Sequence, residues 1–165
     1  MNAAVVAVSL LLAACPANPP PVGPMPPTGQ TPSTGSAPRG TPLATSDVVG
    51  YWSGDWGNLV FREQGGKIFG AYDHDDGTIV GTIVGDQLVG WWCEAPSRKP
   101  DMDAGPVEMK FIVNAEGSRV IDGRWRFASE GDTWKDNWDI TWSSGQAPEA
   151  LVNRFADPAA FCAQP

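Results

Sequence analysis

Apolar and polar residues alternate most clearly in the second half of the chain. Residues 107–113 (VEMKFIV) place an apolar side chain at every second position from Val107, with Glu108 and Lys110 on the opposite face. Residues 119–127 (RVIDGRWRF) and 134–142 (WKDNWDITW) alternate in the same way. A period of two is typical of half-buried β-strands. The residues that we expect to face inward in the last two strands are Ile121, Gly123, Trp125, Phe127, Trp134, Trp138, Ile140 and Trp142.

Residues 68–93 predict three further strands joined by two tight turns. Asp76-Gly77 and Gly85-Asp86 are dipeptides that favour two-residue hairpin loops. If each fills such a loop, counting outward pairs Tyr72 with Gly81. The same counting pairs Ile83 with Gly70 and Leu88, and Ile79 with Trp92.

Both faces of this meander are apolar, so both need cover. One face, which we expect to line the interior, carries Ile68, Gly70, Tyr72, Ile79, Gly81, Ile83, Leu88, Gly90 and Trp92. The other carries Phe69, Ala71, Asp73, Val80, Thr82, Val84, Val89, Trp91 and Cys93. A single sheet cannot bury both faces by itself, and the second face therefore requires a separate lid.

Two more strands, at 48–56 and 59–64, precede the meander, which brings the total to eight. The connections are short, and no helix is expected before the end of the last strand. Sequential short strands at this spacing indicate an all-β protein, an eight-stranded antiparallel up-and-down barrel. A barrel of eight strands encloses a space that side chains can fill or that can hold one small ligand.

Glycines recur on the expected inner face of these strands. A glycine inside a strand costs stability unless it marks a bend or a close approach. We therefore expect the inward glycines to make room for the rings of Trp52, Tyr72, Trp92 and Trp125, as aromatics shield glycines in barrels. The glycines concerned are Gly50, Gly70, Gly81, Gly90 and Gly123.

The tail from 147 to 165 has the pattern of a short helix. Pro148 suits a first helical turn, and Leu151 and Phe155 lie four residues apart on one face. A bond between Cys93 and Cys162 would hold this helix outside the barrel, over the apolar outer face of the meander. We expect Leu151, Phe155 and Phe161 to cover that face.

The N-terminal third has a different composition. Residues 1–14 are an apolar leader that is too short to span a bilayer, and they end in Leu12-Ala13-Ala14 before Cys15. This tetrapeptide resembles the lipobox of bacterial lipoproteins, which implies cleavage before Cys15 and acylation of that residue. An ordinary secretory signal is the alternative. Residues 15–45, rich in proline, are expected to form a disordered tether, and residues 46–165 form the barrel domain.

The net charge of the chain and its expected export restrict the classes of partner that it can have. The chain carries a net charge of −8, and all 19 of its acids lie after residue 45. This balance argues against nucleic-acid binding. The lipobox resemblance implies a bacterial cell-envelope location, in the outer membrane, with the membrane as a partner through the lipid anchor. In an oxidising compartment the two remaining cysteines, Cys93 and Cys162, are expected to form a disulfide.

The sequence contains little that indicates catalysis. The single histidine, His74, lies in a run of aspartates that has a loose likeness to a calcium loop, but the run lacks the downstream glutamate of such loops. We interpret it as a charged hairpin tip and predict no metal. No nucleophile motif, phosphate loop or dinucleotide fingerprint is present, so we expect no cofactor and a protein that is not an enzyme.

Gly50-Tyr51-Trp52, at the start of the first strand, resembles the Gly-x-Trp signature of the calycins, the lipocalins and avidins. The resemblance implies a meander barrel that binds small molecules inside. It covers three residues, and avidin's biotin-binding positions have no match here.

Three functions remain open. The first is a non-catalytic binding or structural barrel, with an envelope protein as one candidate partner, whose bulky inward residues fill its interior. The second is a carrier of one small apolar or aromatic ligand, held at an open end of the barrel. The third is a carbohydrate-binding module that uses exposed rings of Trp56, Trp91 or Trp134. The candidate ligand contacts of the carrier are Trp52, Tyr72, Trp92, Trp125 and Trp138.

Overall fold

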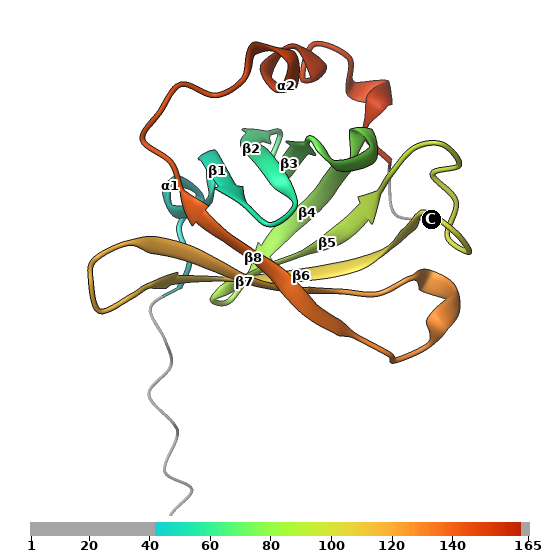
Figure 1. The fold of residues 1–165 in the computed structure, drawn as a ribbon, viewed down its shortest axis with the longest axis horizontal. Coiled ribbons are helices and arrows are strands. Elements are labelled where there is room, and N and C mark those ends of the chain that lie inside the picture. Colours follow the sequence, from blue (N-terminus) through green and yellow to red (C-terminus); the bar gives the residue numbers. More distant parts are fainter. Residues whose placement is uncertain (1–41, 163–165) are drawn as a thin grey trace, which may run out of the picture. The chain divides into compact units, whose positions relative to one another are not determined.

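A computed structural model describes residues 42–162 of the chain, and in it eight antiparallel strands close into a barrel in sequence order (Figure 1). The strands are β1 (Gly50–Gly54), β2 (Gly57–Gln64), β3 (Lys67–Tyr72), β4 (Thr78–Val84), β5 (Gln87–Cys93), β6 (Ala104–Val113), β7 (Arg119–Trp125) and β8 (Lys135–Trp142). The helices are α1 (Thr45–Val48) and α2 (Glu149–Arg154), with short 3₁₀ turns at His74–Asp76, Ala128–Glu130 and Pro158–Ala160. The predicted all-β up-and-down barrel is confirmed. The leader, Cys15 and most of the expected tether lie outside the described residues.

Side chains fill the middle of the barrel. The alternation within each strand sends one set of residues inward, and these form a single core cluster. Among the residues that are less than 2 % exposed are Trp52, Leu59, Phe61, Tyr72, Ile79, Leu88, Met109 and Ile121. The centre of the barrel is therefore a packed core, and any space for a ligand lies at its ends.

The register between β3 and β4 differs from the prediction. Ile68, and not Tyr72, pairs with Gly81, and Gly70 pairs with Ile79. The reason is the connection: a five-residue loop with a 3₁₀ turn at His74–Asp76 replaces the expected two-residue loop. The shift is by four residues, so every side chain keeps its predicted face. Between β4 and β5 the register is as predicted, with Ile79 opposite Trp92 and Ile83 opposite Leu88.

The inward glycines accommodate aromatic rings, but not the four rings that were expected. Phe61 lies over Gly70, where an added Cβ would come within 2.6 Å of the ring, and Trp142 lies over Gly50. Gly81 and Gly90 instead face each other across β4 and β5, where either Cβ would meet the partner backbone. Close packing therefore explains these glycines, but the groups that pack against them differ from the rings that were expected.

The apolar outer face is covered as predicted. Leu151 of α2, Phe155 directly after this helix, and Phe161 are buried against Val60 of β2 and Ala71 of β3. Figure 1 shows α2 lying outside the barrel above these strands. Cys93 and Cys162 form a disulfide with a Cα–Cα distance of 6.2 Å. Trp91, which was expected to be exposed or beneath the helix, is buried in a separate small cluster beside this disulfide.

One helix was not expected. α1 precedes β1, so the prediction of no helix before the last strand is wrong. The Asp47 carboxylate accepts a hydrogen bond of 3.0 Å from the Ala44 N–H at its start, and Val48 is fully buried. Leu43, which was assigned to the tether, packs on the core and donates its N–H to the Gly85 carbonyl at 2.9 Å.

Reduction of the disulfide should destabilise the barrel. The bond joins residues 69 positions apart, and a loop of that order corresponds to about 4 kcal/mol in the chain-entropy description. We expect a reducing agent to lower the thermal unfolding midpoint of the wild type but not that of a Cys93→Ala/Cys162→Ala double variant. Equal midpoints for the wild type with and without the reductant would contradict this.

Candidate functional site

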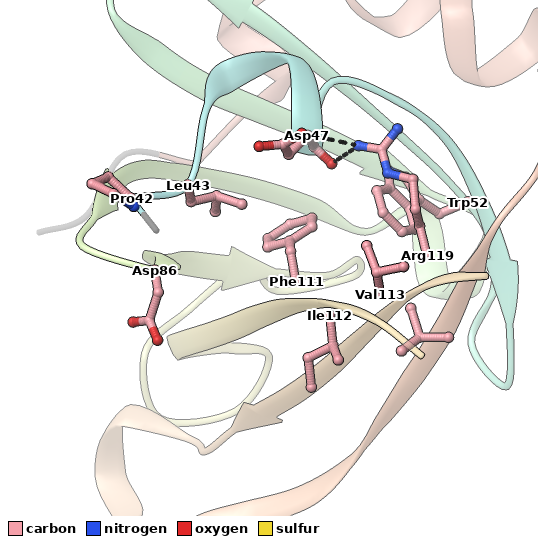
Figure 2. A pocket seen from close by; sticks show the side chains of 10 residues that line it. Pro42, Leu43, Asp47, Trp52, Asp86, Phe111, Ile112, Val113 and Arg119 are labelled. Carbon is pink, nitrogen blue, oxygen red and sulfur yellow. Dashed lines mark hydrogen bonds and ion pairs between the residues drawn. The ribbon is translucent and has the colours of Figure 1, made fainter. Parts of the chain in front are cut away.

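The two ends of the barrel differ in how they are closed. At one end α1 covers the opening, and the Arg119 guanidinium holds it there. Arg119 donates to the Ser46 carbonyl at 3.2 Å and to that of Asp47, and it lies 4.2 Å from the centre of a Trp142 ring. Figure 2 shows this pairing beside a cavity of about 200 Å³ that Trp52 and Phe111 also line. The helix and the arginine leave a shallow recess here, with apolar residues on most of its wall.

The opposite end holds an aromatic cup of about 250 Å³. We use "the cup" for this cavity, whose lining residues are Trp56, His74, Asp75, Trp92, Glu94, Asp103, Trp125, Phe127 and Trp138. They come from the four connections at this end of the barrel and from the strand ends beside them. The cup is therefore built by segments far apart in the sequence, and its floor is the packed core.

The rings of the cup brace one another edge to face. Trp125 lies 5.2 Å from Trp92, 5.2 Å from Phe127 and 5.6 Å from Trp56, each close to perpendicular. Such T-shaped pairs add to stability beyond the area that they bury. The rings of the cup therefore support one another without a ligand.

A β-bulge places two of these tryptophans. Between Gly123 and Trp125 the pairing with β8 slips by one residue, so that Lys135 rather than Asp136 lies opposite Trp125. Asn137, one of the two β8 residues within the bulge, accepts a hydrogen bond of 2.8 Å from each of the indoles of Trp56 and Trp125, through its backbone and side-chain oxygens respectively. Bulges commonly re-aim side chains at barrel rims.

The same bulge overturns the prediction for Trp134. A slip of one residue reverses the faces of a strand. Trp134 lies on the outer surface instead, with the guanidinium groups of Arg124 and Arg126 over its ring at 4.6 Å and 5.2 Å. The tryptophans that were proposed as exposed sugar contacts therefore do not share a surface: Trp91 is buried, Trp56 lines the cup and Trp134 is covered by arginines.

Tyr72 and Glu94 form the polar base of the cup. The Tyr72 hydroxyl donates to Glu94 Oε1 at 2.8 Å, and its ring meets Trp138 at 5.1 Å. Burial, together with the Glu94 charge, raises the pKa of Tyr72 well above its ordinary value, so the phenol stays protonated. Burial also raises the pKa of Glu94, against the lowering effect of its hydrogen bond with Tyr72.

An ion-pair clamp holds the rim loop that carries His74 and Asp75. The Asp76 carboxylate pairs with Arg98 at 2.8 Å and with Arg154 of α2 at 3.2 Å. Arg154 also donates to the Tyr72 carbonyl at 3.0 Å. α2 and the loop after β5 thus fix the position of the loop that carries His74 and Asp75. Within this loop, Asp75 and Asp76 have positive φ angles.

His74, Asp75 and Glu94 bring one ligand atom each to within 4.8 Å of the others. His74 and Asp75 are exposed, and Nε2 of His74 lies 3.6 Å from the Asp75 carboxylate. Two exposed groups and one carboxylate already bonded to Tyr72 are a weak metal-binding set. We keep the interpretation of a charged loop tip.

Three of the five predicted ligand contacts, Trp92, Trp125 and Trp138, line the cup. Tyr72 is fully buried beneath it and reaches the cup through its hydrogen bond to Glu94. Trp52 lies at the other end and donates its indole N–H to the Val48 carbonyl at 3.0 Å. Their role as ligand contacts stays a prediction. Sequence reasoning missed Glu94, although alternation from Trp92 would have placed it on the inner face. Asp103 had no comparable signal, because it lies in a connection, whereas Phe127 was expected to face inward but not to contact a ligand.

Comparison of the chain with protein-family models, with curated proteins and with solved structures finds no match. Among the residues that the structure describes, no helix has the length and apolar character needed to cross a membrane.

The raised pKa of Glu94 predicts a pH-dependent stability difference. An acid with a higher pKa in the folded than in the unfolded protein stabilises the fold at low pH, and this contribution is lost as the pH rises through the folded pKa. Glu94→Gln removes the titration but keeps an acceptor for Tyr72. We expect the unfolding free energy of the variant, relative to wild type, to rise as the pH increases above the ordinary pKa of a glutamate, about 4.3. Urea denaturation measures it, with the exposed Glu116→Gln as control. A difference that is independent of pH would contradict the prediction.

Proposed function

We propose that the protein is a cell-envelope lipoprotein, anchored through an acylated Cys15, whose barrel is a non-catalytic binding module. The cup is the proposed binding site, and its ligand is a small organic molecule. The single observation that carries the proposal is a preformed aromatic cavity at one end of a barrel whose centre is filled.

The size and lining of the cup support this proposal. Ligand sites are usually concave, mostly apolar and supplied with a few convergent polar groups. The cup has four indoles and one phenyl ring around Glu94, Asp75, Asp103 and His74. Its volume of about 250 Å³ lies just below the range of about 300–1,000 Å³ for drug-sized ligands, so the ligand is small.

The anchor is supported by the apolar leader and by Leu12-Ala13-Ala14-Cys15, and the disulfide of the barrel agrees with an oxidising compartment. Several acyl chains would hold the protein firmly, because each buried methylene contributes about 0.8 kcal/mol. The membrane is then the one macromolecular partner that the chain requires. The acidic charge supports a role that does not involve nucleic acid.

Ligand binding in the cup can be tested by following tryptophan indole signals. We expect at least one class in a library of neutral apolar, aromatic, sugar and amine compounds to move the indole N–H resonances of Trp92 and Trp125. Trp134, which lies on the outer surface, is an internal control and should not move. If no compound shifts the cup signals, or if all tryptophans shift together, the cup is not a ligand site and the barrel serves as a structural module.

The anchor is tested separately. Mass spectrometry of the protein purified from its own cell envelope should find acyl chains on Cys15 as the new N-terminal residue. Cys15→Ala should release the protein into the soluble fraction, whereas Cys93→Ala/Cys162→Ala should leave it attached. An unmodified mature N-terminus would remove the lipoprotein part of the proposal and leave the binding part intact.

A further inference from the structure

Three of the four indole N–H groups of the cup are already used by the protein. Trp56 and Trp125 both donate to Asn137, each at 2.8 Å, and Trp92 donates to the Arg126 carbonyl at 3.1 Å. These three side chains therefore offer ring carbon and π surface to the cavity, and no hydrogen-bond donor.

The remaining polar groups of the cup are mostly acceptors. Glu94, Asp75 and Asp103 are carboxylates, and among the described residues no Lys or Arg lines the cavity. The Asp103 carboxylate accepts the Ser97 N–H at 3.0 Å, and a carboxylate oxygen has further lone pairs to offer. His74 and the indole N–H of Trp138 are the lining side-chain groups that can donate to a ligand. The cup is thus rich in acceptors and negative charge and poor in donors.

The chain itself places an ammonium group against the rings of this cup. Nζ of Lys135 lies 4.0 Å from the centre of the Phe127 ring and 4.5 Å from that of Trp125. Both distances fall within the range of about 6 Å in which a cation is attracted to an aromatic face. Lys135 is paired with Glu130 at 2.9 Å, so this pair adds no net charge beside the cup.

We propose that the ligand of the cup is a small organic ammonium ion, of the size of choline. This inference rests on the proposed function and narrows it to a chemical class. Aromatic faces and carboxylates together are the surroundings that an organic cation needs, since the rings attract its charge without requiring donors.

Other ligand classes fit these groups less well. An anion would meet three carboxylates and only one histidine as a compensating group. A sugar presents both donors and acceptors, and most of its acceptors would lose hydrogen bonds to water without replacement in a cup that has few donors. A neutral apolar molecule would use the rings but leave the carboxylates unpaired.

Choline and its neutral carbon isostere, 3,3-dimethylbutan-1-ol, provide a matched test on the full chain. They share shape and hydroxyl group and differ in charge. Titration calorimetry and the indole resonances of Trp92 and Trp125 should show choline binding at least about tenfold more tightly, the size expected for a partly desolvated cation beside aromatic rings. Glucose serves as the sugar probe.

Charge variants locate the effect. Glu94→Gln and Asp103→Asn should each weaken choline several-fold and leave the isostere unchanged. Glu116→Gln removes the same charge in the turn between β6 and β7, at the other end of the barrel, and should leave choline binding unchanged. Circular dichroism confirms that each variant is folded.

The outcomes separate this inference from the function on which it rests. Equal or tighter binding of the isostere, or preferential binding of glucose, overturns the ammonium ligand while the cup remains a binding site. Absence of choline binding in the folded wild type also overturns it, and the wider library then decides whether the cup binds anything. If Glu116→Gln weakened choline binding as much as the cup variants do, the effect would come from the net charge of the protein. That result would also reject the cup as the cation site.

Discussion

The two apolar faces of the sheet from β2 to β5 are the constraint on which the rest of the structure depends. A barrel buries only its inner face, and Val60, Phe69, Ala71 and Val80 would remain in water on the outer one. The C-terminal segment resolves this by packing three apolar side chains on that face. Hydrophobic burial drives the docking, and the disulfide restricts how far the segment can separate from the sheet in the unfolded chain.

The docked segment also shapes the mouth of the cup. Arg154 of α2 reaches the carbonyl of Tyr72 and the carboxylate of Asp76, and Arg98 meets the same carboxylate from the loop after β5. The lid that covers the outside of the barrel therefore also orders a loop at its rim. Arg154 is partly buried, and burial lowers its pKa against the opposing effect of Asp76. The clamp thus links outer packing to the geometry of the site.

Local pattern was sufficient to predict much of this fold. Alternation assigned the faces of the strands, and even a register error of four residues in the hairpin of β3 and β4 preserved them, because the side-chain period is two. It failed at Trp134, where a bulge that depends on packing around Asn137 reversed the faces. The cup was only partly foreseen. Trp92, Trp125 and Trp138 lie in strands and follow alternation, as does Phe127 just beyond β7, whereas Asp75 and Asp103 lie in connections whose meeting depends on the closed barrel.

The first and the last described residues of the chain lie at opposite ends of the barrel. Leu43 pairs with Gly85 at the end covered by α1, so the polypeptide enters on the side opposite the cup, whereas Cys162 is tied to Cys93, the residue before Glu94 at the cup end. A protein immobilised through a group placed ahead of Pro42 would keep its mouth open to the medium. A group attached near Cys162 would instead lie beside that mouth. The segment before α1 is therefore the better point of attachment for sensors or display.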